Sequence, residues 1–159
     1  MGVIEFFYSN SEPYLCGTTL ISPEYALTSA DCVITLVNLP AYIGHTVRFG
    51  IVDLNDKTAL NNSVLTVTSP SNYISNSSMT INDIAILKLK TPVNLSNNIK
   101  PISIPKNDVG LIERTNVITG WGYYSINCGG NNVNNTIVGN MSQNLLKASV
   151  TVIDYITCR

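Results

Sequence analysis

Short runs of β-branched and aromatic residues, separated by turn residues, are the feature of this sequence that most limits its possible folds. Six such runs lie in the first 90 residues: Val3–Tyr8, Cys16–Ile21, Tyr25–Ser29, Val47–Val52, Ser63–Thr68 and Asp83–Leu89. Runs of this length and composition are typical of β-strands, and several at this spacing favour a closed sheet. The sequence therefore predicts an all-β protein that begins with a six-stranded barrel. No long stretch with helical periodicity precedes the C-terminus.

A proline-containing stretch after the sixth run predicts a boundary between two parts of the chain. In Ile99–Pro105 each proline lacks an amide donor and disfavours helix in the residue before it, so we expect an extended connector. We place the N-terminal barrel at residues 1–105. Residues 106–159 are then predicted to begin a second barrel, with early strands at Asn116–Gly122 and Leu146–Ile153.

The charge balance excludes several classes of partner. Nine Lys and Arg residues face ten Asp and Glu residues, and the net charge of −1 gives no basic footprint for nucleic acid or for an anionic membrane. No apolar stretch is long enough to span a bilayer. The only histidine, His45, has no Cys, His or carboxylate at ligand spacing, so we expect a surface residue, no metal site and no cofactor.

Sequons and cysteines together favour an oxidising, secretory environment. Five Asn-x-Ser/Thr sequons occur, with the candidate glycosylation sites Asn61, Asn76, Asn94, Asn134 and Asn140. Together with four cysteines they are typical of a secreted protein, although an Asn-rich sequence also forms sequons by chance. The opening segment Met1–Phe7 lacks the basic and apolar regions of a signal peptide. We interpret this conflict as a sign that Met1 is not the natural start of a complete protein.

Five short motifs follow one another in an order that narrows the fold further. They are Cys16–Ser22, Leu27–Cys32, Asn82–Leu89, Ile99–Pro105 and Gly120–Gly122. In this order and with these gaps they resemble the trypsin-like serine protease family (chymotrypsin fold, S1). The resemblance runs from about Val3 to Cys158 and implies an all-β double barrel whose catalytic groups meet between the barrels. It spans only roughly the first two-thirds of such a domain, so the second barrel is expected to be incomplete.

The resemblance assigns roles to four residues. Asp83 matches the aspartate that orients the catalytic histidine in the family, although this carboxylate could instead cap a turn beside Asn82. Asp31 stands at the position where the family has that histidine. Cys16 and Cys32 match a disulfide that holds the turn bearing this position.

Several features that catalysis in this family needs are absent from the 159 residues. No Gly-Asp-Ser-Gly-Gly occurs, so no serine can be assigned as the nucleophile, and the family's Ile-Val-Gly-Gly amino terminus is missing as well. A general base should titrate near the working pH, as an imidazole does at about 6.5, whereas an unperturbed aspartate titrates at about 3.9. Two carboxylates at close range do not comfortably both ionise, so Asp31 and Asp83 are expected to share a proton, to bridge through water or to turn apart.

The remaining cysteines and the paired carboxylates leave alternatives open. Four cysteines allow three pairings. If Cys16 and Cys32 are joined as the resemblance implies, Cys158 is expected to be unpaired, although a bond between it and Cys128 stays open. The two aspartates also have the residue types of a glycosidase or aspartic protease acid–base pair, but the neighbouring motifs argue against that chemistry.

These observations lead to three hypotheses about function. The leading one is a catalytically inactive homologue, a pseudoprotease, that acts by binding as a decoy, scaffold or inhibitor in an extracellular proteolytic or defence pathway. Its expected partners are proteases, protease inhibitors or host defence proteins, and the resemblance implies secretion. The second hypothesis is a fragment of an active endopeptidase, in which Asp31 is an error or a compensated change. The third is a degenerate product without independent function, because a partial barrel leaves unpaired strand edges.

Overall fold

The computed structural model divides the chain into two compact units. It describes residues 1–9, 11–56, 58–59, 61–76, 79–107, 110–124 and 141–154. Unit 1 comprises Met1–Ile51 and Lys57–Ile104, and unit 2 comprises Val52–Asp56 and Pro105–Arg159. Of the helices in the described ranges, none combines the length and the apolarity that a membrane span requires.

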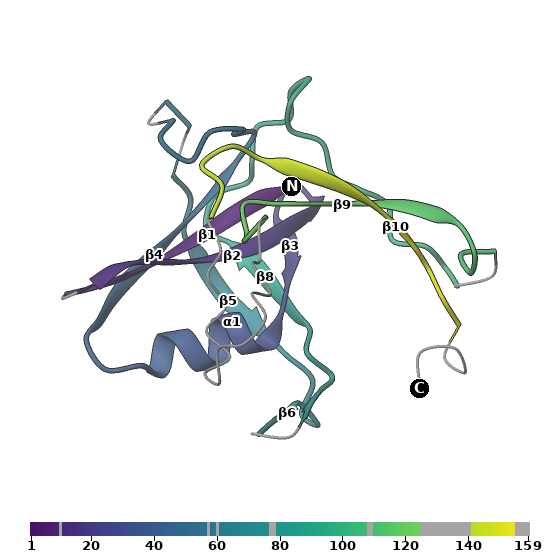
Figure 1. Cartoon of the computed structure of the whole chain (residues 1–159). Coiled ribbons are helices and arrows are strands. Elements are labelled where there is room, and N and C mark those ends of the chain that lie inside the picture. The colour runs from purple at the N-terminus through teal and green to yellow at the C-terminus, as the bar shows by residue number, and fades with distance from the viewer. Residues whose placement is uncertain are drawn as a thin grey trace, which may run out of the picture. The chain divides into compact units, whose positions relative to one another are not determined.

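Unit 1 is built on a six-stranded antiparallel sheet with the order β4-β1-β2-β3-β8-β5. The strands are β1 Gly2–Tyr8, β2 Ser11–Ser22, β3 Tyr25–Thr28, β4 Tyr42–Phe49, β5 Val64–Thr68 and β8 Ala85–Leu89. Figure 1 shows these strands wrapping around a common centre. The two edges of the sheet meet where Val47 on β4 pairs with Asn62, just before β5, through two backbone hydrogen bonds of 2.9 and 2.8 Å. The sheet thus curls back on itself, which confirms the six-stranded barrel that the sequence predicts.

The other elements of unit 1 are short. Helix α1 spans Ala30–Thr35 and a 3₁₀ turn, η1, spans Leu36–Asn38. A small hairpin pairs β6 Ile74–Ser75 with β7 Thr80–Ile81. Figure 1 shows α1 and β6 toward the bottom of the view.

The barrel core follows the two-residue period of the strands. On β8, Ala85, Leu87 and Leu89 are buried while Ile86 between them is 40% exposed. The buried cluster of the barrel consists of Ile4, Phe6, Tyr8, Cys16, Leu20, Ala26, Ala30, Val33, Val47, Phe49, Ala85, Leu87 and Leu89. The strands β1, β2, β3, β4 and β8 and the helix α1 all contribute side chains to this cluster. The core therefore packs α1 against the barrel.

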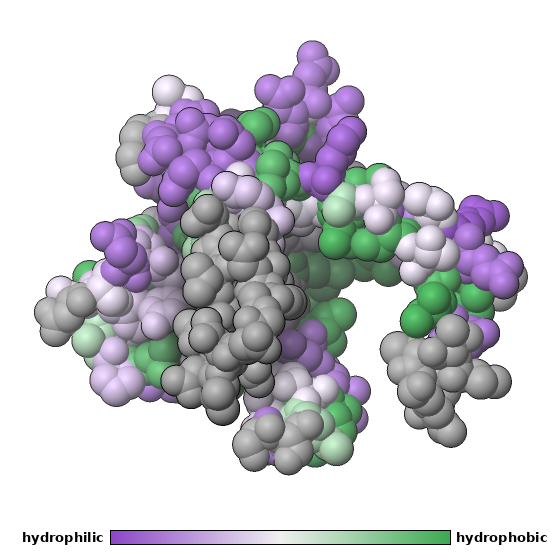
Figure 2. Space-filling view, viewed as in Figure 1, coloured by the Kyte–Doolittle hydropathy of each residue, from purple (hydrophilic) through white to green (hydrophobic). Residues whose placement is uncertain are grey.

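Unit 2 contains the antiparallel pair β9 Thr115–Gly120 and β10 Leu146–Thr151. These are the two early strands expected in this region. Trp121 is buried, and its indole N–H donates to the carbonyl of Val52 at 3.0 Å, which ties the segment Val52–Asp56 to this unit. The β9–β10 pair itself exposes apolar side chains such as Val117 and Ile118, and Figure 2 shows green residues along it.

The hairpin between β1 and β2 contains a β-bulge. Ser9–Pro13 is rich in residue types that favour turns, yet β2 already begins at Ser11. Phe6 pairs with Tyr14 and Tyr8 with Ser11, so two residues of β2 lie opposite one residue of β1. This bulge places Pro13 in the strand where the missing amide donor is tolerated.

His45 lies in β4, paired with Phe6, and is partly exposed. Its ring centroid is 5.8 Å from that of Phe6, and its Nδ1 is hydrogen-bonded to the Tyr42 hydroxyl at 2.5 Å. β4 begins at Tyr42, several residues before the predicted strand, and therefore includes His45.

A bidentate ion pair lies between β1 and β4. The Arg48 guanidinium donates to both carboxylate oxygens of Glu5, at 2.7 and 2.8 Å, and the two side chains are 4% and 17% exposed. Thr46 adds a hydroxyl donor to the same carboxylate at 3.3 Å. Charge-assisted forks of this kind set the register of neighbouring strands as well as holding them together.

We expect Arg48→Met to lower the free energy of unfolding by about 3 kcal/mol, because it leaves the Glu5 carboxylate buried without its cation. The double variant Glu5→Leu/Arg48→Met should recover most of that loss, since no charge then remains buried. Urea unfolding followed by far-UV circular dichroism measures both values. Equal losses in the single and double variants would contradict this account of the pair.

We also expect stability to fall as the pH drops below about 6.5, the ordinary pKa of histidine. Burial lowers the pKa of His45, so the unfolded chain binds a proton at a pH where the folded chain does not. The stabilising contribution is present above the unfolded pKa and is lost as the pH falls toward the folded one. His45→Gln removes the chain's only histidine. The urea midpoint of this variant should therefore depend less on pH, and an unchanged dependence would contradict the assignment.

Candidate active site

The start of helix α1 carries the position that resembles the catalytic histidine. Ser29 is the N-cap, with an extended backbone, and its hydroxyl accepts the amide N–H of Cys32 at 3.3 Å. Asp31 lies in the first turn, where a negative side chain favours the helix dipole. Ala30 and Val33 are buried against the barrel. This six-residue helix was not predicted, although a serine followed by an aspartate in the first turn is the usual signal for a helix start.

A disulfide connects the helix to the sheet. Cys16 on β2 is bonded to Cys32 on α1, with their Cα atoms 6.3 Å apart, as the resemblance implies. The bond closes a loop with a sequence separation of 16 residues, which in the chain-entropy model contributes about 3 kcal/mol. It therefore keeps the start of α1 against β2.

Two threonine side chains connect β2 to β3 close to this disulfide. The Thr18 hydroxyl donates to the Leu27 carbonyl at 3.0 Å, and the Thr28 hydroxyl donates to the Gly17 carbonyl at 2.8 Å. These reciprocal contacts join β2 to the end of β3, immediately before α1. They add side-chain hydrogen bonds to the backbone ladder at the point where the site begins.

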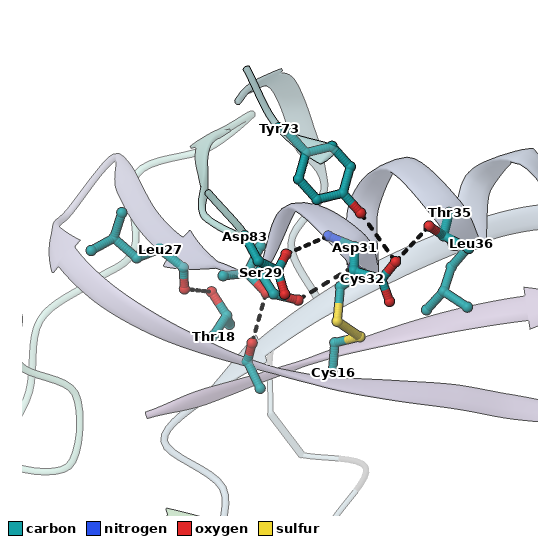
Figure 3. The surroundings of a disulfide bond; sticks show 12 residues. Cys16, Thr18, Leu27, Ser29, Asp31, Cys32, Thr35, Leu36, Tyr73 and Asp83 are labelled. Atoms are coloured by element: carbon teal, nitrogen blue, oxygen red, sulfur yellow. Dashed lines mark hydrogen bonds between the residues drawn. A yellow bond between two sulfur atoms is a disulfide. The ribbon is translucent and has the colours of Figure 1, made fainter. Parts of the chain in front are cut away.

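The structure brings the two aspartates together (Figure 3). Oδ1 of Asp83 accepts the backbone N–H of Asp31 at 2.8 Å. Asp83 lies just before β8, and its side chain is exposed to solvent. Its neighbour Asn82 has a left-handed backbone, with φ of 56°, and donates its side-chain amide to the Asn72 carbonyl at 2.9 Å. The turn at Asn82 thus aims the Asp83 carboxylate at the first turn of α1.

The side chain of Asp31 has partners of its own. Its Oδ1 accepts the hydroxyl of Thr35 at 2.7 Å and the hydroxyl of Tyr73 at 3.1 Å. The two carboxylates accept hydrogen bonds from separate donors (Figure 3). Tyr73 is a site residue that the sequence did not reveal. The only hint of its position is the Pro70 turn before it, whose carbonyl accepts the Tyr73 N–H at 3.1 Å.

Within the described residues, neither aspartate is hydrogen-bonded to an imidazole. In the proton relay of a serine hydrolase, a carboxylate holds one nitrogen of an imidazole while the other nitrogen takes the proton of the nucleophile. Here Asp83 bonds a main-chain amide, which cannot pass a proton on. The Asp31 carboxylate bonds two hydroxyl groups that belong to the scaffold. The arrangement is suited to fixing α1 and the loop before β6.

The other predicted site residues are distributed as follows. The sequon asparagines Asn61, Asn76 and Asn94 are exposed. Asn134, Asn140, Cys128 and Cys158 lie outside the described residues. Within the described ranges, no three His, Cys, Asp or Glu side chains are grouped as metal ligands would be.

Comparison with known sequences shows which family the chain resembles. The family model described as Trypsin matches residues 3–159. Vitamin K-dependent protein C of Oryctolagus cuniculus is 39% identical over 119 residues, covering 69% of this chain and 24% of that protein. Brachyurin of Leptuca pugilator is 36% identical, covering 69% of this chain and 45% of its own length. Phenoloxidase-activating factor 3 of Holotrichia diomphalia is 32% identical, with 72% and 36% covered.

Solved structures share the fold. Neuropsin, a serine protease expressed in the limbic system of mouse brain, superposes with a TM-score of 0.74 at 21% identity, over 98% of this chain and 61% of that one. The structure of GrC gives the same TM-score at 20% identity, with 99% and 61% covered. The chain thus spans less than half of these three sequence relatives and about three-fifths of these structures. With its motifs in family order and the family model matching nearly its whole length, this chain belongs to the trypsin family.

Proposed function

We propose that this chain is a non-catalytic member of the trypsin family that works by binding other proteins. The observation that carries the proposal is the environment of Asp31. Its carboxylate occupies the family's histidine position and is engaged by the hydroxyls of Thr35 and Tyr73. A residue used in this way supports the fold at the place where a protease needs a general base.

The chemistry of a carboxylate at this position supports the same proposal. Taking a proton from a serine hydroxyl calls for a base that titrates near the working pH, which an imidazole does and an ordinary aspartate does not. An aspartate is also shorter than a histidine and has only one functional group. It cannot be oriented by Asp83 at one atom and reach a nucleophile with another, so both roles of the histidine are lost together.

Exposed apolar side chains around the site favour a binding role. Ile74, Met79 and Ile81 on the β6–β7 hairpin are 47%, 53% and 40% exposed, and Ile84 beside Asp83 is 48% exposed. Apolar side chains gathered on an exposed surface and rimmed by polar groups mark protein interaction sites. The partners in this proposal are proteases, protease inhibitors or host defence proteins, and the protein acts as a decoy, scaffold or inhibitor among them.

The proposal places the protein outside the cell. The Cys16–Cys32 disulfide is compatible with an oxidising compartment, where such bonds persist. Binding in an extracellular proteolytic or defence pathway is therefore the setting in which the function should be sought.

We expect Asp31→Ala to lower the free energy of unfolding by about 1 kcal/mol, because both hydroxyl donors lose their acceptor. Asp31→Asn keeps an acceptor oxygen and should cost less. The double variant Asp31→Ala/Tyr73→Phe should lose less than the two single losses combined, with a coupling energy of about 0.5–1 kcal/mol. Urea unfolding measures the cycle, and strict additivity would show that the Asp31–Tyr73 contact carries no stability.

We further expect no peptide hydrolysis by the purified chain across neutral and alkaline pH. Fluorogenic substrates with basic, aromatic and small residues before the scissile bond test the three common preferences of such enzymes. Asp31→His should be equally inactive, since these 159 residues contain no Gly-Asp-Ser-Gly-Gly. Hydrolysis by the unaltered chain that disappears in Asp31→Ala would refute the proposal and favour an active endopeptidase.

Binding requires its own assay, with trypsin and a protein inhibitor of trypsin as probes. A decoy should bind the inhibitor and restore trypsin activity, whereas an inhibitor should lower trypsin activity directly. The chain reduced and alkylated at its cysteines is the control, because it has lost the bond that positions α1. No effect in either arm would count against the decoy and inhibitor roles.

A further inference from the structure

We propose that Asn61 and Asn94 both carry N-linked glycans and that these glycans stand at the end of the barrel opposite Asp31. Both residues begin sequons, Asn61-Asn62-Ser63 and Asn94-Leu95-Ser96. In the structure, each asparagine and its serine are exposed. This inference does not rest on the absence of catalysis.

Asn61 precedes Asn62, whose backbone and side chain are both hydrogen-bonded within the barrel. Asn62 pairs with Val47 along the backbone, and its side-chain amide donates to the Thr91 carbonyl at 2.6 Å. Its side-chain oxygen accepts the Ser63 N–H at 2.8 Å. Successive side chains in an extended segment point to opposite sides. With Asn62 turned to the protein, Asn61 is turned to solvent, where an attached oligosaccharide has room.

Asn94 is exposed between Val93 and Ser96, two residues held by backbone hydrogen bonds. Val93 before it donates its N–H to the Pro23 carbonyl at 2.8 Å. Ser96 after it exchanges backbone hydrogen bonds with Ile99, at 3.0 and 3.3 Å. A short exposed segment held on both sides presents its side chain without disturbing the core. A bulky glycan on Asn94 is therefore compatible with the folded barrel.

The two sequons lie at the same end of the barrel. Val64, directly after the first sequon, pairs with Leu89 at the end of β8, and Lys90 donates its N–H to the Ser63 carbonyl at 2.8 Å. The second sequon begins at Asn94, shortly after Lys90 in the chain. Asp83 stands before the opposite end of β8, and a strand rises about 3.3 Å per residue, so Ala85 and Leu89 are about 13 Å apart. Glycans on both sites would leave the Asp31 end uncovered.

Asn76 differs from these two sites in position. It lies in the loop of the β6–β7 hairpin, and its side-chain oxygen accepts the Met79 N–H at 3.0 Å. The same hairpin follows Tyr73, whose hydroxyl bonds Asp31. A glycan there would stand beside the Asp31 end, so Asn76 is not part of the proposal.

The modification needs a donor from the secretory pathway, a lipid-linked oligosaccharide pyrophosphate. The side-chain amide nitrogen of the asparagine bonds to the anomeric carbon of the oligosaccharide and loses one proton. The bond from that carbon to the lipid pyrophosphate breaks, and the pyrophosphate leaves. No oxidation or reduction takes place.

The test is expression of the full chain through the secretory pathway of eukaryotic cells, with a signal peptide supplied. Peptide mapping after treatment with peptide N-glycosidase locates each glycan, because the enzyme converts the glycosylated asparagine to aspartate. We expect this conversion at Asn61 and at Asn94. Asn61→Gln and Asn94→Gln should each lose one glycan, and so should Ser63→Ala and Ser96→Ala, which keep the asparagines.

Asn97→Gln is the matched control, because Asn97 lies in the same exposed stretch and begins no sequon. It should keep both glycans. An intact Cys16–Cys32 disulfide in the secreted protein shows that the chain passed through the oxidising compartment and folded. Conversion at only one of the two asparagines, or at neither, in protein with that bond overturns the proposal, whatever the state of Asn76.

Discussion

The first turn of helix α1 is held in place by three kinds of bond, and the geometry of the site depends on them. The Cys16–Cys32 disulfide ties the helix to β2, and the Ser29 hydroxyl caps its amino end. The Asp83 carboxylate accepts the N–H of Asp31. Cys16 and Asp83 lie far from this turn in the sequence, whereas Ser29 directly precedes it. None of the three contacts uses the side chain of Asp31, so none requires a particular residue at that position.

In our proposal, this arrangement lets the trypsin-family scaffold persist with an aspartate at the position that resembles the catalytic histidine. Asp83 bonds the main chain, so its contribution to the fold does not require a histidine at Asp31. The Asp31 side chain is free to take a new role, and it bonds Thr35 on its own helix and Tyr73 on the loop before β6. In our proposal, the position has passed from proton transfer to support of the neighbouring loop.

Much of the fold could be predicted from the sequence because strand periodicity and motif order are local signals. The six strands of the barrel and the Cys16–Cys32 bond were expected and are present. Helix α1 was missed because its six residues are too few to show a helical period. The inclusion of His45 in β4 was missed because β4 begins earlier than its apolar residues suggest. Tyr73 was missed because only the folded chain brings it to Asp31.

The central claim is that no base at Asp31 activates a serine. The most direct measurement is intact mass spectrometry of the secreted protein after incubation with a serine-directed phosphonate, which forms a covalent adduct only with an activated serine. The account predicts an unchanged mass for the unaltered protein, alongside full labelling of trypsin under the same conditions. A single adduct on the unaltered protein that is lost in Asp31→Ala would contradict it.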